Sequence, residues 1–243
     1  MRQEIKVAVR ATLTDGLSAL KRPIGEWRFR KAARSAHGPL LVSTGAGSRK
    51  LEGWLNTDVS WRASLYLDLT KPWPVPPVSV ARIYADNVIE HFPLLVARRV
   101  LQYAFDALEP GGRIRLATPD VEGTARAYLN DPDLTTRHLE RHRQFGYDVH
   151  YPVDLLRVTF SECGHHTGFC YDWHALSKEL YRAGFLDVER FAPGESNDTL
   201  LKNLELRTAP TEVATSLITE ARKPKLEDRA RHYASCFVSL ARQ

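Results

Sequence analysis

A short glycine-containing loop follows the first strongly apolar run of the sequence. The run at 39–43 leads directly into Ser43-Thr-Gly-Ala-Gly-Ser48. Gly45 and Gly47 carry no side chain that would keep a ligand away from the backbone, and open α/β sheets bind ligands at the carboxyl ends of their strands. The loop therefore indicates a nucleotide-like ligand, although a tight turn has the same composition.

Acidic residues follow the next two apolar runs. Asp58 ends the run at 54–59, where its carboxylate could accept hydrogen bonds from both hydroxyls of a ribose. Asp68 and Leu69 could provide a carboxylate for an adenine amino group and an apolar wall for its ring. Asp68-Leu-Thr-Lys-Pro72 is also favourable turn chemistry, so both interpretations of Asp68 stay open.

The spacing between the glycines and the first carboxylate is short. Asp58 follows Gly47 by 11 residues, whereas the dinucleotide-binding motif places its acidic residue about 20 residues further on. A parallel crossover with its helix needs at least about 10–12 residues. We therefore predict a shortened first crossover and a cofactor site that is more open than usual.

Histidines are the candidate proton acceptors, because imidazole titrates near neutral pH. His91 follows the expected strand at 80–85. A packing role at the start of a helix is the alternative for this residue. His165 and His166 lie in a His-rich stretch and could contact a substrate or lie in a solvated loop. Together with Cys163 and Cys170 they also suggest zinc ligands, but the spacing fits no standard finger. We expect reduced thiols and no metal.

Short apolar runs alternate with helical patterns along the chain, which predicts an α/β sheet with crossover helices. The stretch at 130–171 fits no simple alternation, and we interpret it as an inserted, irregular segment on the acceptor side. The expected strands are 39–43, 54–59, 80–85, 113–117, 185–191 and 216–220, and the expected helices are 94–108 and 173–183.

The ordered series of motifs resembles a bacterial, type 11-like branch of the class I S-adenosylmethionine-dependent methyltransferases. The resemblance covers roughly residues 39–222 and rests on Gly45-Ala-Gly47, Gly53-Trp-Leu-Asn-Thr-Asp58, Asp68-Leu-Thr-Lys-Pro72, Asn87-Val-Ile-Glu-His91, Leu108-Glu-Pro-Gly-Gly112, Gly164-His-His166, Tyr171-Asp172 and Ala183-Gly-Phe185.

The resemblance implies a Rossmann-like α/β fold with a mostly parallel seven-stranded sheet, a reversed last strand and helices on both faces. By position, Gly45, Ala46 and Gly47 would line the methionine part of S-adenosylmethionine, Asp58 its ribose, Asp68 and Leu69 its adenine, and Asn87 the sulfonium end. The sequence departs from the family at Ala46, where Cys is usual, and at Ser43-Thr44, where the strand is usually apolar or contains Asn.

The length of 243 residues fits one domain with an appendage. We expect a basic N-terminal helical segment (1–37), a methyltransferase domain (38–222) and a C-terminal helical extension (223–243). Three cysteines and the lack of a long apolar run predict a cytoplasmic protein.

Positive charge is concentrated at the N-terminus. Residues 1–37 contain nine Lys/Arg and three Asp/Glu, a net +6, which leaves −1 for the rest of a chain whose total is +5. A near-neutral main domain makes a nucleic-acid substrate unlikely. The basic segment also has an apolar stripe at Ile5, Val9, Leu13, Leu17 and Leu20. It could pack on the domain, or contact a membrane surface or another protein.

The leading hypothesis is therefore an S-adenosylmethionine-dependent O-methyltransferase acting on a small molecule or glycan. One alternative is a catalytically inactive binding or scaffold protein that has kept the fold, which the Ala46 departure and the short crossover favour. A nicotinamide-dependent oxidoreductase is the other, and the 11-residue spacing and the lack of a third loop glycine disfavour it.

Overall fold

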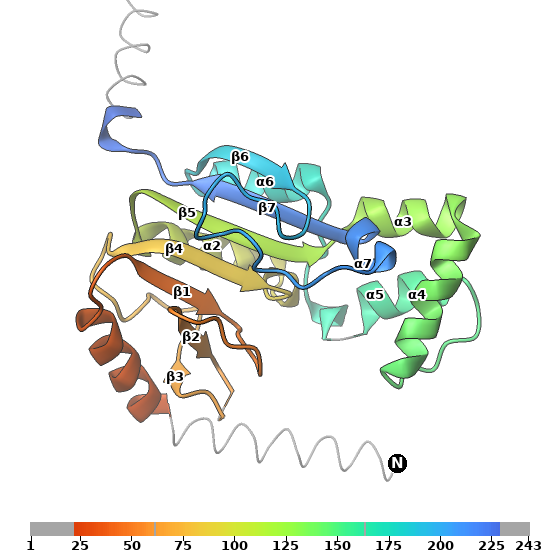
Figure 1. The fold of residues 1–243 in the computed structure, drawn as a ribbon, viewed down its shortest axis with the longest axis horizontal. Coiled ribbons are helices and arrows are strands. Elements are labelled where there is room, and N and C mark those ends of the chain that lie inside the picture. Colours follow the sequence, from red (N-terminus) through yellow and green to blue (C-terminus); the bar gives the residue numbers. More distant parts are fainter. Residues whose placement is uncertain (1–21, 61, 163, 229–243) are drawn as a thin grey trace, which may run out of the picture.

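A seven-stranded sheet forms the centre of the molecule, as the computed structural model shows for residues 22–60, 62–162 and 164–228 (Figure 1). Its strands lie in the order β3-β2-β1-β4-β5-β7-β6. The strands are β1 (Leu40–Thr44), β2 (Leu55–Asp58), β3 (Leu65–Tyr66), β4 (Val80–Asp86), β5 (Leu108–Pro119), β6 (Leu186–Phe191) and β7 (Ser216–Arg222).

Strand β7 runs against its neighbours, and the strands from β3 to β5 are parallel. β7 pairs antiparallel with both β5 and β6, with Ile114 opposite Ala221. The pairs β1–β2, β2–β3, β1–β4 and β4–β5 are parallel. This arrangement confirms the predicted α/β fold with a mostly parallel seven-stranded sheet and a reversed last strand, and it places the carboxyl ends of β1, β2, β4 and β5 along one edge.

One face of the sheet is covered by helices. α2 (Leu94–Ala107) and α6 (Trp173–Arg182) begin and end within a residue of their predicted bounds. Leu101 of α2 and Leu176 of α6 are buried in the same core cluster as Ile83 of β4 and Ile114 of β5. The apolar faces of these helices and strands therefore pack against each other in a single core.

The connection between β1 and β2 is as short as the sequence predicted. Residues 45–54, all of them described, form turns and contain no helix. The loop is held by the backbone NH of Ala46, which donates to the carbonyl of Thr57 at 3.0 Å. A shortened crossover is thus confirmed, and it leaves the glycine loop at the open edge of the sheet.

The second face carries charge at its centre. Arg115 of β5 is fully buried and donates two hydrogen bonds to Glu205, at 2.7 and 2.6 Å, and further bonds to Glu220 and to the carbonyl of Glu195. Beside it, Arg82 of β4 donates to Asp198 at 2.5 Å. These contacts fasten the irregular segment 192–209 over the strands, so in the described residues this segment covers the second face, where helices were predicted on both faces.

A helical layer lies beyond the carboxyl ends of β1, β4 and β5 (Figure 1). Its helices are α3 (Val121–Asn130), α4 (Pro132–Gln144), α5 (Asp154–Ser161) and α7 (Pro210–Ala214). Much of the stretch 130–171, expected to be irregular, is therefore helical. Asp131 caps α4 by accepting from the backbone NH of Leu134 at 2.8 Å, with Pro132 in the first turn. This Asp-Pro pair is a helix start signal.

The N-terminal basic segment is described only from residue 22. A helix over residues 22–34 buries Phe29 completely in the core, so this half of the segment packs on the domain. The apolar stripe from Ile5 to Leu20 lies outside the described residues, as does the C-terminal extension after residue 228. None of the described helices is both long and apolar enough to cross a membrane.

We predict that the buried charge cluster is decisive for stability. Arg115→Met would leave the carboxylate of Glu205 buried without its cation and that of Glu220 with only Arg113, 3.8 Å away, which should lower the free energy of unfolding by about 3–5 kcal/mol. Arg126→Met is the matched control, because Arg126 pairs with Glu122 on the surface, where the two side chains are 69% and 51% exposed. Its loss should cost no more than about 0.5 kcal/mol. Equal effects in urea denaturation would contradict the prediction.

Candidate functional site

A small cavity opens at the carboxyl ends of β1 and β4. It has a volume of about 160 Å³ and contains three of the predicted cofactor residues, Gly45, Ala46 and Asn87. Gly45 has φ +60°, and a Cβ there would come within 2.5 Å of the Val88 side chain. Both the conformation and the close approach therefore require glycine. The remaining lining residues are Ser43, Thr44, Arg49, Leu51, Tyr84 and Asp86.

Asp58 and Gly47 meet beside this cavity. One carboxylate oxygen of Asp58 accepts from the backbone NH of Gly47 at 2.9 Å, and the other accepts from the NH of Ser60 at 2.7 Å. Each oxygen keeps a further lone pair. The carboxylate therefore fixes the glycine loop and can still accept hydrogen bonds from a ligand.

The two predicted adenine residues follow β3 and lie outside the lining of this cavity. Asp68 accepts from the backbone NH and the hydroxyl of Thr70, at 3.0 and 2.6 Å, and lies 3.4 Å from Lys71. These contacts are those of a turn, the role that the sequence offered for Asp68 as the alternative to adenine binding. Leu69 is 8% exposed and belongs to the apolar core. Neither residue lines the cavity that contains Gly45, Ala46 and Asn87.

A larger cavity of about 500 Å³ adjoins the first, and Asn87 lines both. It lies between the strand ends and the helical layer. Its lining is unusually rich in imidazoles, with His91 and His165 joined by His138 and His142 of α4. Asn87 has φ 52°, a left-handed conformation that asparagine tolerates.

His138 and His142 were not singled out by sequence analysis. They are one turn apart on α4, and their ring centroids lie 4.5 Å apart. The Nδ1 atoms of both are buried without a hydrogen-bond partner among the described residues. Burial, and then the neighbouring charges of His142 and Arg141, lower the pKa of His138 to about 4. The His-x-x-x-His spacing was the signal that placed both rings on one face.

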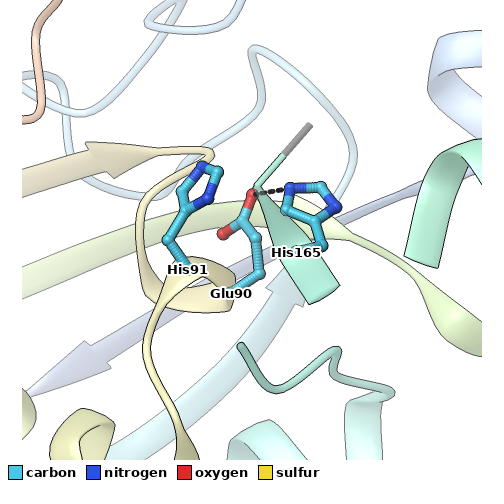
Figure 2. Close-up of side chains that lie close together, drawn as sticks. All are labelled: Glu90, His91 and His165. Atoms are coloured by element: carbon cyan, nitrogen blue, oxygen red, sulfur yellow. Dashed lines mark ion pairs between the residues drawn. The ribbon is translucent and has the colours of Figure 1, made fainter. Parts of the chain in front are cut away.

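Three side chains with possible metal-ligand atoms lie close together (Figure 2), and two of them, His91 and His165, line the larger cavity. Glu90 and His91 belong to the 3₁₀ turn η1 (Ile89–His91), and His165 belongs to η2 (His165–Thr167). The rings of His91 and His165 are 4.9 Å apart between centroids. His165 Nε2 lies 3.9 Å from Glu90 Oε1. One ligand atom from each residue lies within 4.8 Å of the others.

Glu90 is buried to an unusual degree for a carboxyl group. Its side chain is 0% exposed, and Thr118 donates to its Oε2 at 3.0 Å. Oε1 has no hydrogen-bond partner among the described residues. Burial raises the pKa of Glu90 to about 7. Glu90 belongs to the motif Asn87-Val-Ile-Glu-His91, but the sequence predicts no role for it, because nothing local predicts that a carboxyl at a helix start is buried.

The ring of His91 is more open and borders the cavity. Desolvation, followed by the nearby His165, lowers the pKa of His91, and hydrogen bonds to the backbone of Gly164 and Asn87 oppose this shift. Its imidazole is therefore biased toward the neutral form that can accept a proton. His165 is 7% exposed and has its Nδ1 2.6 Å from the carbonyl of Thr159.

His166 lies apart from this group. It is exposed and is not among the residues that line either cavity. Of the residues weighed as zinc ligands, His165 lies instead beside Glu90, with its Nε2 3.9 Å from Glu90 Oε1. Cys170 is a free thiol, and Cys163 lies outside the described residues.

Comparison with known proteins is limited to the fold. No family model and no curated protein matches the sequence. Among solved structures, a methyltransferase of Thermotoga maritima, described as a possible histamine N-methyltransferase, is 14% identical over 84% of this chain and 92% of that chain, with a TM-score of 0.47. The CurJ carbon methyltransferase is 16% identical over 80% of this chain, with a TM-score of 0.45.

A third structure is phosphoethanolamine N-methyltransferase 2 of Haemonchus contortus in complex with S-adenosylmethionine. It is 10% identical over 82% of this chain and 52% of that chain, with a TM-score of 0.41. This chain likewise spans 52% of the CurJ protein, about half its length. At these identities the likeness concerns the fold alone.

We predict that His138 makes stability depend on pH. Because its pKa is about 4 in the folded protein and about 6.5 in the unfolded chain, the unfolded chain binds more protons between these values. Lowering the pH from 7 to 5 should therefore remove about 2 kcal/mol of unfolding free energy through this residue. Urea denaturation at both pH values should show this loss reduced in His138→Gln. His174→Gln removes an exposed histidine and should keep the wild-type loss; equal losses in both variants would refute the assignment.

Proposed function

We propose that the protein is an S-adenosylmethionine-dependent methyltransferase that methylates an oxygen of a small molecule or glycan. The observation that supports this most is the pair of adjoining cavities that share Asn87. One cavity contains the glycine loop predicted to contact the methyl donor. The other is larger, lies under the helical layer and can take an acceptor. A donor and an acceptor bound in them would meet at Asn87.

The residues present fit the methyl donor in part. Gly45 gives close backbone access, and Asp58 keeps free lone pairs beside it. The cavity volume of about 160 Å³ is below the roughly 300 Å³ of ordinary small-molecule pockets. A bound cofactor would therefore extend from this cavity over the exposed loop at Gly47 and Asp58. When bound, S-adenosylmethionine supplies a methyl group whose bond to sulfur breaks, with its electron pair left on sulfur, as the acceptor atom bonds to carbon.

His91 and His165 are better placed than His166 to take the proton that an acceptor hydroxyl must lose. Both line the larger cavity with Asn87. A positioned base contributes about 10²–10⁴-fold to such a transfer. Of the two, His91 is exposed toward the cavity and its lowered pKa favours the neutral ring. We assign the role of base to His91.

The inactive binding or scaffold protein remains the second candidate, and one observation favours it. Arg207 donates to both Asp86 and Asn87, and Arg49 lies 3.8 Å from Asp86. Arg49 lines the smaller cavity and Arg207 the larger one, so both side chains border the place where a bound cofactor would reach Asn87. If they do not move aside, the site binds no S-adenosylmethionine and the fold serves another purpose.

Asp58→Ala tests the cofactor site. Loss of hydrogen bonds to a charged group should weaken binding of S-adenosylhomocysteine by about 1.5–3 kcal/mol, or roughly 10- to 150-fold, as measured by isothermal titration calorimetry. Glu52→Ala removes an exposed carboxylate from the same loop and should bind as the wild type does. A folded Asp58→Ala protein with unchanged affinity would remove Asp58 from the site. Binding of NAD in place of S-adenosylhomocysteine would overturn the proposed function.

A further inference from the structure

We propose that Glu90, His91 and His165 (Figure 2) form a binding site for one divalent transition-metal ion, beside the larger cavity that the two histidines line. Two imidazoles and a carboxylate are a common ligand set for zinc and for other first-row metals. The zinc ligands considered from the sequence were Cys163, His165, His166 and Cys170. Only His165 belongs to the site proposed here.

The buried carboxylate gives the first reason. Glu90 Oε1 is completely buried and lacks a partner among the described residues, although buried acceptors are nearly always satisfied. Its sister atom Oε2 is held by Thr118, so the orientation of the carboxyl is fixed. The unsatisfied oxygen faces His165 rather than the apolar core.

The facing nitrogen gives the second reason. His165 Nδ1 lies 2.6 Å from the carbonyl of Thr159, which can only accept, so Nδ1 carries the proton of the neutral ring and Nε2 presents a lone pair. Nε2 and Glu90 Oε1 are 3.9 Å apart, too far for a hydrogen bond. A tetrahedral ion bound at about 2.0–2.2 Å requires its ligands about 3.4 Å apart. A shift of about half an ångström would bring the two atoms to this spacing.

His91 completes the set. A neutral imidazole has one NH, which the backbone near Gly164 or Asn87 can accept, and its other nitrogen is left to coordinate. Metal-bound histidines usually donate their second nitrogen to a carbonyl or carboxylate in this way. His165 has such an outer hydrogen bond, to the carbonyl of Thr159.

The backbone holds the two turns together at this point. The NH of Phe169 donates to the carbonyl of Glu90 at 3.1 Å, and a Cβ on Gly168 would lie 1.8 Å from that oxygen. Only glycine allows the turns to approach so closely. The ligands thus come from two turns, 75 residues apart in sequence between Glu90 and His165, that the fold already holds together.

Three protein ligands leave at least one position open on the ion, as in catalytic zinc sites. That position borders the cavity that His91, His165 and Asn87 line together. If the proposed methyl transfer holds, the ion would bind the acceptor oxygen there and ease loss of its proton, and His91, as a ligand of the ion, would then not act as the base. This role of the ion rests on the proposed function, whereas metal binding does not.

Equilibrium dialysis of the full-length, chelator-treated protein against Zn²⁺ tests the site, with metal content measured by mass spectrometry. The wild type should retain one equivalent. Glu90→Gln keeps the size of the side chain, and His165→Asn keeps an NH donor for Thr159 while removing Nε2. Each should weaken Zn²⁺ binding by at least about 100-fold, the upper end of losses seen even for outer-shell partners. His166→Asn, at the exposed neighbouring histidine, should bind as the wild type does.

The proposal is overturned if the wild type retains no Zn²⁺, if either ligand variant binds like the wild type, or if His166→Asn loses the ion equally. A Co²⁺ spectrum with thiolate charge-transfer bands would also overturn it, because the cysteines would then be the ligands. Titration of the same proteins with S-adenosylhomocysteine separates the two proposals. Zn²⁺ retained without nucleoside binding supports the metal site and contradicts the methyltransferase, and the reverse result does the opposite.

Discussion

Parallel strand pairing decides where chemistry can occur in this chain. Because β1, β2, β4 and β5 run in the same direction, their carboxyl ends deliver the glycine loop, Asp58 and Asn87 to one edge of the sheet. The short β1–β2 connection leaves this edge without a helix over residues 45–54. Both cavities lie at this edge, and Asn87 lines both of them.

The polar interior follows from the same arrangement. The buried Arg115 cluster fastens segment 192–209 to the second face, and this segment carries Arg207, which donates to Asp86 and Asn87. On the other side, the close approach of Gly168 to Glu90 joins η2 to η1. Stability and function are therefore coupled, since the contacts that close the fold also position the side chains around Asn87.

The sheet could be predicted from sequence because buried parallel strands are nearly continuous apolar runs, and the reversed β7 followed from the resemblance. The helices at 132–144 and 154–161 could not be recognised by apolar periodicity, since α4 is strongly charged and its buried face includes His138. Its Asp131-Pro132 start was the better signal. Glu90 was missed because its burial depends on Thr118 and Gly168, which are distant in sequence. The separation of Asp68 from the cavity likewise depends on how the turn after β3 folds.

The central claim is that a methyl donor and its acceptor meet at Asn87. A crystal structure of the protein with S-adenosylhomocysteine tests it most directly. The account predicts that the sulfur lies beside Asn87 and faces the cavity lined by His91 and His165. The side chains of Arg49 and Arg207 should have moved away from Asp86 and Asn87. A ligand whose sulfur faces away from that cavity, or a nucleoside bound at Asp68 instead of Asp58, would contradict the account.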